Sequence, residues 1–336
     1  MRQTKRALVL SMILFFVAIS LAPAQEPPVI AAAKKEGKVI LYLSAQMSLG
    51  QAISKAFERK FPFLKVEITR TSGENLLNRI RTEKLAGKIV FDVVYGATVP
   101  LLPQIGVVKP YVSPEASVYT AKFREPNDLW TAASANYYVI GYNTRLVSRA
   151  EAPRNWDDLL DPRWKRKIAL DPEEFSWFGA MESYLGEEKA TRLMSGLARQ
   201  EIQWRKNHTT LAQFMAAGEY PIALVYAHGV EEIKNKGAPV EWVRTSKPIV
   251  VDVQPVAISA QASHPNAARL FADFLLSAEG QRIIFDDRKI PVRPGVIPES
   301  SPLHPAALEI FPSPPKVVTN LSHYAGKFEQ IFGPRR

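Results

Sequence analysis

The feature that most constrains the fold is an alternation of short strand-like runs with helical segments. Residues 38–44 (KVILYLS) are apolar and rich in strand formers, and residues 49–61 then place apolar side chains at a helical period. A second strand-like run, FLKVEITR, precedes the helical segment NLLNRIRTEKLA, for which Thr71 or Ser72 can act as N-cap. A third run, KIVFDVVYG, follows. This order with short links predicts an α/β fold with a parallel sheet and right-handed crossovers.

A second series of the same kind begins near Trp156. The segment NWDDLLDPRWKRK predicts a short helix and a turn, and KIALDPEE predicts a strand that leads into a loop. Two helical segments follow, FSWFGAMESYL and EKATRLMSGLARQ, and then a short strand, IQWRKN. TTLAQFMAAGEY predicts a helix with Thr209 or Thr210 as N-cap, and PIALVY a further strand. The sequence therefore predicts two α/β lobes.

Two long extended stretches, residues 130–143 and 247–260, have no helical period. If both cross between lobes, the chain leaves the first lobe, builds the second and returns. The expected organisation is a first lobe from 25–133, a second lobe from 134–250, and a return to the first lobe with a Pro-rich C-terminal wrap over 251–336.

The N-terminus has the pattern of a secretory signal peptide. Arg2, Lys5 and Arg6 precede an apolar run, and Ala22-Pro23-Ala24 supplies the small residues that a signal peptidase reads. The run of about 15 apolar residues is short of the roughly 20 needed to span a bilayer. Residues 1–24 are therefore expected to be removed after Ala24, which predicts a periplasmic protein.

Composition excludes several chemistries. The chain has no cysteine, which rules out disulfides, thiol catalysis, cysteine metal sites and an N-terminal lipid on cysteine. The formal net charge is +10, but three of the positive charges lie in the predicted signal peptide and the others are spread along the chain. This pattern does not favour a nucleic-acid partner, whereas a mild attraction of anionic solutes is compatible with it.

No familiar enzyme motif is present. The patterns G-x-S-x-G, H-E-x-x-H, G-x-G-x-x-G and G-x-x-x-x-G-K-[ST] are missing, and the five histidines form no metal-spaced pair. We therefore expect neither catalysis nor a cofactor. An exported enzyme remains an alternative, for which Asp171 and Glu173 are the nearest candidates for an acid–base pair.

Polar loops follow the predicted strands, at the edge where open α/β sheets bind ligands. Several of these loops precede a helix, so free backbone N–H groups favour an anionic ligand group. Helix capping alone is the competing interpretation for Ser72, Thr209 and Thr210. The predicted ligand-binding residues are Ser44, Gln46, Ser72, Gly73, Ala97 and Thr98 in the first lobe, and Asp171, Glu173, Thr209, Thr210, Tyr226 and His228 in the second.

These segments together resemble the periplasmic solute-binding proteins of ABC importers, in the type II cluster that includes ferric-ion-binding members. The resemblance is carried by AAKKEGKVILYLS, FDVVYGA, YYVIGYNTRLV, NWDDLLDPRWKRKIAL, AAGEYPIALVY and HPNAARLFADFLLSAEGQ. It implies two lobes joined by two crossover strands, which close on one solute by hinge bending. It also implies a membrane permease as partner. A monomer is expected because each cleft would be complete within one chain. A sensor that passes closure to a receptor is an alternative role on the same scaffold.

The resemblance leaves the solute open. Ferric-binding members commonly carry two adjacent tyrosines where this chain has Tyr226-Ala227-His228, and the first loop, Ser44-Ala45-Gln46, offers no histidine or glutamate. Tyrosinate is a hard ligand that suits ferric iron. One alternative is therefore a ferric ion held by Tyr226 with a synergistic anion, and with His228, Asp171 or Glu173 as further ligands. The other is a small organic or phosphorus-containing anion held by hydroxyl and backbone donors, with Arg70 as a candidate contact.

Overall fold

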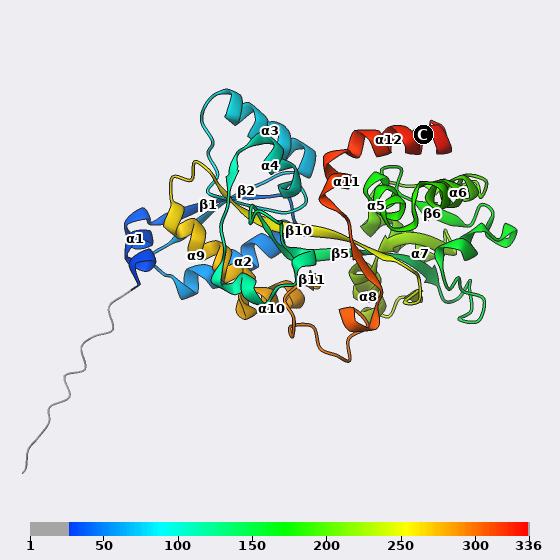
Figure 1. Ribbon diagram of the computed structural model, residues 1–336. Coiled ribbons are helices and arrows are strands. Elements are labelled where there is room, and N and C mark those ends of the chain that lie inside the picture. Colours follow the sequence, from blue (N-terminus) through cyan, green and yellow to red (C-terminus); the bar gives the residue numbers. More distant parts are fainter. Residues whose placement is uncertain (1–26, 335–336) are drawn as a thin grey trace, which may run out of the picture.

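The computed structural model describes residues 27–334, and the predicted signal peptide, residues 1–24, lies outside them. Two α/β lobes stand side by side and are connected by the long strands β5 (Thr131–Asn143) and β10 (Ile249–Ser259), as Figure 1 shows. Within residues 27–334, none of the helices has the length and apolar character needed to cross a membrane.

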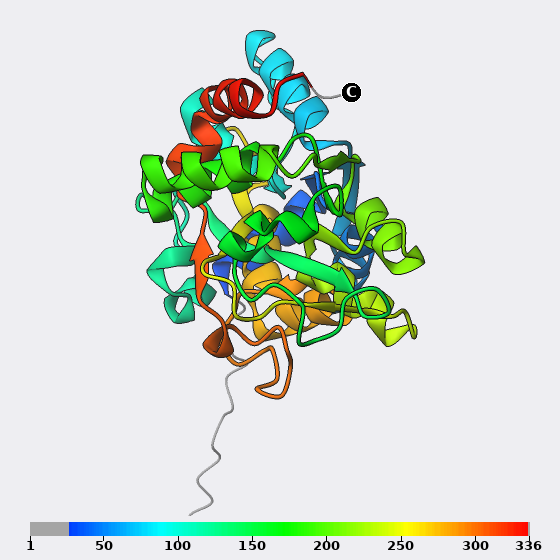
Figure 2. The ribbon, with the colours of Figure 1, turned by 90° about the vertical axis from the view of Figure 1, so that its right-hand side faces the viewer.

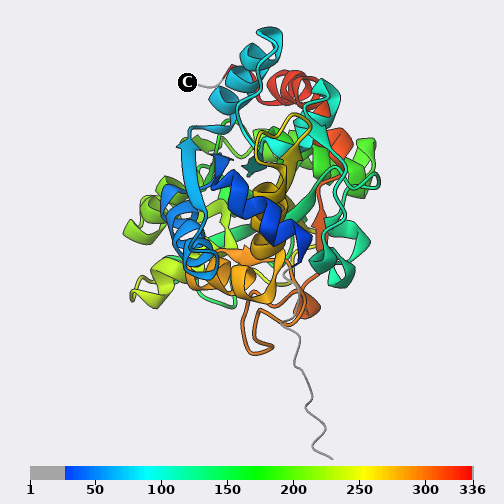
Figure 3. The same cartoon turned by 90° about the vertical axis from the view of Figure 1, so that its left-hand side faces the viewer.

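A parallel sheet forms the centre of the first lobe. Strand β1 (Lys38–Leu43) pairs with β2 (Lys65–Arg70) on one side and with β3 (Val93–Tyr95) on the other. Its helices are α1 (Pro28–Glu36), α2 (Met47–Lys60), α3 (Gly73–Leu85), α4 (Leu102–Ile105), α9 (Pro265–Leu276) and α10 (Ala278–Asp286). Figure 3 shows α1 lying across α9 on the outer side of this lobe, so the start and the return of the chain pack together.

The second lobe repeats this arrangement. Strand β8 (Ile222–Tyr226) pairs in parallel with β6 (Ile168–Leu170), which pairs in parallel with β7 (Gln203–Trp204). Its helices are α5 (Phe175–Leu185), α6 (Glu187–Ala198), α7 (His208–Ala217) and α8 (Ala227–Asn235). The expected N-caps of α7 are wrong: Asn207 precedes the helix, and its side chain accepts from the backbone N–H groups of Thr209 and Thr210. An Asn side chain reaches the N2 and N3 donors from this position, so the threonines lie inside the helix.

The two crossing strands join the lobes into one sheet. The strand order is β2-β1-β3-β10-β5-β8-β6-β7. The purely parallel sheet expected from strand–helix alternation is incomplete, because β10 pairs antiparallel with β3 and β5, and β5 antiparallel with β8. A strand that leaves one lobe for the other reverses direction relative to its neighbours, so each parallel set ends at a crossing strand. Short strands complete the sheet: β4 (Val108–Lys109), β9 (Val240–Trp242), β11 (Ile290–Pro291) and β12 (Ile310–Pro312).

A buried aspartate fixes the return of the chain to the first lobe. Both oxygens of Asp92, at 0% exposure, accept hydrogen bonds: Oδ2 from the backbone N–H of Ile40 (2.8 Å) and Oδ1 from that of His264 (2.9 Å). The His264 Nδ1 atom lies 2.8 Å from the same carboxylate. Helix α9 begins at the next residue, so this buried group orients the helix against β1.

The C-terminal segment reaches both lobes. Strand β12 pairs in parallel with β10, and α11 (Pro315–Thr319) contacts both α5 and the first-lobe 3₁₀ turn at Val99–Leu101. Helix α12 (Leu321–Phe332) then packs on α5 and α6, above them in Figure 2. The other 3₁₀ turns are Pro114–Val118, Ala121–Phe123, Trp156–Leu160, Pro162–Trp164 and Pro305–Ala307. The wrap therefore ends on the second lobe.

Candidate functional site

A cavity of about 260 Å³ lies between the lobes, where the predicted polar loops meet. It is bordered by the loop after β1, the end of β2, the two crossing strands, the first turns of α7 and α8, and the turn before β11. Its lining residues are Ser44, Ala45, Gln46, Leu49, Arg70, Ser134, Asn136, Asn207, His208, Thr209, Tyr226, His228, Gln254 and Lys289.

On the first-lobe side, parallel pairing brings a serine and an arginine to one edge. Leu43 is opposite Arg70, so Ser44 and Arg70 lie at neighbouring strand ends. The Arg70 Nε atom donates to the carbonyl of Ala45 (3.3 Å), and the guanidinium stays exposed. The Ser44 Oγ atom is buried without a hydrogen-bond partner among the described residues, so it retains a donor and an acceptor for a solute.

Alternate residues of β5 form the floor. Successive strand side chains point to opposite faces, so Ser134, Asn136 and Tyr138 share the face that borders the cavity. On β10, Gln254 is opposite Ser134 and Asp252 is opposite Asn136. Ser134, Asn136 and Gln254 were not among the predicted ligand-binding residues. The signal was present as polar residues at every second position of SANY, within a run otherwise expected to be apolar.

Tyr226 stands at the end of β8, directly opposite Tyr138 of β5. The two rings make an edge-to-face contact with centroids 5.0 Å apart, and their hydroxyl oxygens are 3.4 Å apart. Burial, with the nearby carboxylate of Asp252, raises the pKa of both phenols well above the usual value. Ala227 follows at 0% exposure as the first residue of α8, so it contributes no ligand atom.

Next to Tyr226 lies a pair formed by His208 and Glu174, neither of which was among the predicted site residues. The His208 ring packs on Tyr226 with centroids 3.9 Å apart, and its Nε2 atom is 3.6 Å from Oε1 of Glu174. Glu174 is 1% exposed, and burial raises the pKa of its carboxyl group well above the usual value. Burial lowers the pKa of His208 to about 4. The imidazole is therefore neutral at neutral pH.

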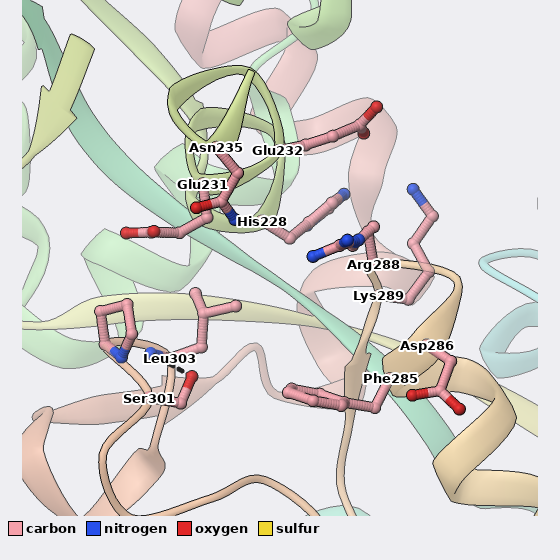
Figure 4. Close-up of a pocket in the computed structure, with 11 residues that line it drawn as sticks. His228, Glu231, Glu232, Asn235, Phe285, Asp286, Arg288, Lys289, Ser301 and Leu303 are labelled. Carbon is pink, nitrogen blue, oxygen red and sulfur yellow. Dashed lines mark hydrogen bonds between the residues drawn. The ribbon is translucent and has the colours of Figure 1, made fainter. Parts of the chain in front are cut away.

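Two residues close the other end of the cavity. His228, 8% exposed in the first turn of α8, faces Lys289 from the turn before β11 (Figure 4). Burial, and then the charge of Lys289, lower the pKa of His228 to about 3. Burial also lowers the pKa of Lys289. The two groups come from different lobes, so a solute that contacts both links the lobes.

Of the twelve predicted ligand-binding residues, the structure brings five together around this cavity. They are Ser44, Gln46, Thr209, Tyr226 and His228. The residues that do not line it are Ser72, Gly73, Ala97, Thr98, Asp171, Glu173 and Thr210.

Local structure explains where several of these seven lie. Thr98 is 3% exposed and donates to the carbonyl of Gly73 (3.0 Å), and Ala97 points to solvent. Ser72 occupies the N-cap position of α3 without a side-chain capping bond. Thr210 is held at the α7 N-terminus through its backbone N–H.

The two acidic candidates stabilise the loops around α7. Asp171 accepts from the backbone N–H of Glu173 (2.9 Å) and from that of Asn207 (2.6 Å), and so holds the turn that starts α7. Glu173 is exposed and pairs with Lys206 at 2.8 Å. Among residues 27–334, no three His, Asp or Glu side chains are grouped so as to hold a metal ion.

This fold and site belong to a known class. Residues 100–314 match the family model for bacterial extracellular solute-binding proteins, so the chain belongs to that family. Capture of a solute between two lobes, rather than catalysis, is the activity of this class, and the fold is that of the two-lobed periplasmic binding proteins.

Individual relatives show the same relationship. An uncharacterised protein of Haemophilus influenzae is 28% identical over 75% of this chain and 76% of its own length. The major ferric iron-binding protein of Neisseria meningitidis is 24% identical over 77% and 82%, respectively.

Solved structures share the fold. Iron-bound HitA from Pseudomonas aeruginosa superposes with a TM-score of 0.77 at 23% identity, covering 88% of this chain and 99% of that one. The periplasmic binding protein AfuA from Actinobacillus pleuropneumoniae, with fructose-6-phosphate bound, superposes with a TM-score of 0.75 at 24% identity, covering 89% and 100%. These two neighbours carry chemically different solutes, so the fold alone does not select between them.

Proposed function

We propose that this chain is a periplasmic carrier that binds a small organic anion, with a carboxylate or phosphate group, and delivers it to the permease of an ABC importer. The observation that carries the proposal is the charge of the cavity lining. Arg70 and Lys289 are the basic side chains of that lining, its two histidines are neutral at neutral pH because burial lowers their pKa values, and no carboxylate is among its residues. Cations with hydroxyl and amide donors around them favour an oxyanion.

Several features support a carrier. Residues of both lobes line one cavity, which fits a carrier that closes on its solute. Ser44 and Arg70 belong to one lobe, and Tyr226 and His228 to the other. An anion that contacts both sets stabilises the closed arrangement of the lobes, because a ligand shifts an equilibrium toward the state it binds better. The periplasmic binding protein AfuA, whose structure holds fructose-6-phosphate, shares the fold.

A ferric ion with a synergistic anion is the second candidate. It is favoured by the 3.4 Å separation of the Tyr138 and Tyr226 hydroxyls and by the ferric-binding relatives. Ala227, in place of a second loop tyrosine, and the position of Asp171 and Glu173 outside the cavity lining speak against it.

Isothermal titration of the mature protein, residues 25–336, tests the proposal. The panel contains inorganic phosphate, sugar phosphates, small carboxylates and ferric citrate. We expect one organic anion to bind with 1:1 stoichiometry. Arg70→Gln should reduce its affinity about tenfold or more. Arg192→Gln, an exposed change on α6, is the matched control. Binding of iron alone, with no response to any organic anion, would overturn the proposal.

A further inference from the structure

A second cavity, of about 350 Å³, adjoins the first, and both are lined by His228 and Lys289. Its second-lobe wall is α8. Its first-lobe wall is the end of α10 with the following turn, and residues 301–303 close the lower side in Figure 4. The space between the lobes therefore continues beyond the cavity already described.

The first-lobe wall presents two adjacent cations. Arg288 has a left-handed backbone (φ 61°), and the N–H groups of Arg288 and Lys289 donate to the carbonyls of Phe285 and Ile284, both at 3.0 Å. This tight turn ends α10 and holds both side chains on the side of α8, as Figure 4 shows.

The carboxylates around this second cavity already have basic partners. The pairs are Glu231 with Arg244 (3.4 Å), Glu232 with Lys236 (2.7 Å) and Asp286 with Arg282 (3.7 Å). Arg288 and Lys289, in contrast, form no ion pair within 4 Å in the part of the chain that the structure describes. Asp287, in the same turn, also has no ion pair among the described residues, and its Oδ2 atom is buried without a hydrogen-bond partner. The two cations, Arg288 and Lys289, therefore exceed the one unpaired carboxylate by one positive charge.

His228 supplies a donor or acceptor from the opposite lobe. Its side chain is 8% exposed, and its Nδ1 atom has no hydrogen-bond partner among the described residues. A buried polar atom without a partner is unfavourable unless a ligand or water completes it. In Figure 4 the imidazole extends from α8 toward Arg288 and Lys289.

We propose that His228, Arg288 and Lys289 form a second anion subsite, so that the solute of this protein carries two anionic groups at its two ends. One group lies near Arg70, at the end of β2, and the other at the turn before β11. The connected strand row β2-β1-β3-β10-β5-β11 separates these positions. The five steps between neighbouring strands, each about 4.8 Å, add up to about 24 Å, so a single phosphate is too small to contact both ends. The Arg70 and Lys289 side chains extend from these ends to line the same cavity, so the solute has to span only the gap between them, for which we propose a chain of about six carbons.

This inference rests on the proposed function, and three related probes separate the two. Glucose 6-phosphate and gluconate each carry one anionic group, and 6-phosphogluconate carries both at opposite ends. Titration of the unmodified mature protein should show that 6-phosphogluconate binds about tenfold or more tightly than either singly charged probe. Lys289→Gln, and separately the exposed Arg288→Gln, should remove most of that advantage.

Arg282→Gln is the matched control. It removes an exposed arginine of the same helix that is paired with Asp286, so the preference for 6-phosphogluconate should persist. Equal binding of 6-phosphogluconate and a singly charged probe, or an advantage that survives both Lys289→Gln and Arg288→Gln, would overturn the second subsite and leave the proposed function intact. Absence of binding by every organic anion would refute both.

Discussion

The hydroxyl oxygens of Tyr138 and Tyr226 lie 3.4 Å apart, although 88 residues separate them in the chain. The antiparallel register of β5 and β8 creates this contact, because it places the two residues directly opposite each other. A ferric ion would bind these oxygens as tyrosinates, whereas an anion would accept hydrogen bonds from the protonated phenols. Burial favours the protonated form, since it raises the pKa of both groups.

Replacement of Tyr226 by Phe distinguishes these alternatives. We expect Tyr226→Phe to reduce the affinity for the organic anion about three- to tenfold, which is the effect of one lost hydrogen bond, and to leave the protein folded. Ferric citrate added to the unmodified protein should give no tyrosinate-to-iron absorption band. A visible band that disappears in Tyr226→Phe would assign the site to iron instead.

The buried histidines predict acid sensitivity. The folded pKa values, about 4 for His208 and about 3 for His228, lie below the unfolded value of 6.5. Between these values the unfolded state binds more protons, so stability is lost as pH falls from about 6.5 to 4. In His208→Gln the free energy of unfolding should fall by roughly 3 kcal/mol less over this pH range than in the unmodified protein.

Thermal melting between pH 4 and pH 7.5 measures this effect. His323→Gln, a change of an exposed histidine in α12, should leave the pH dependence as it is. If His208→Gln follows the same curve as the unmodified protein, His208 is not a buried neutral group.

Asp252 predicts a trend of opposite sign. Burial raises its folded pKa to about 6 from 3.8, so the folded state binds more protons in that interval and stability falls as pH rises through it. Asp252→Asn should therefore increase the free energy of unfolding at pH 7.5 by about 1–3 kcal/mol and raise the melting temperature at that pH. The same substitution should also increase the affinity for the anion, because it removes a negative charge near Tyr226. A lower melting temperature at pH 7.5 would show that the charged carboxylate is stabilising.

Gly96 is the position where an added methyl group would most directly disturb the site. Its φ is 131°, and a Cβ atom there would lie 2.1 Å from Oγ of Ser44. We expect Gly96→Ala to lower the free energy of unfolding by roughly 1–3 kcal/mol and to reduce the affinity for the solute by displacing Ser44. Gly87→Ala is the control: its φ is 69° with nothing within 4 Å, so it should lower stability through backbone strain alone. Equal solute affinity in both variants would remove Ser44 from the site.

The local pattern predicted most of the elements because each depends on neighbours in the chain. Helical periodicity located α2, α3 and α7, and the short apolar runs located β1, β2, β6 and β8. The strand-end rule then predicted Ser44, Gln46, Thr209, Tyr226 and His228 among the residues that line the cavity. Such residues are recognisable because a polar loop between a strand and a helix is a property of consecutive residues.

Long-range pairing decided the rest. Asn136, Gln254 and Lys289 meet at the cavity only because β5, β10 and β11 are aligned side by side, and no local pattern specifies that register. The same limit applies to Glu174, whose burial beside His208 depends on the N-terminal ends of α5 and α7 meeting in the folded chain. The sequence by itself determined the class of fold and the edge of the sheet where a solute binds. Only the tertiary structure decided which distant side chains face that solute and with what charge, because those properties arise from contacts between segments far apart in the chain.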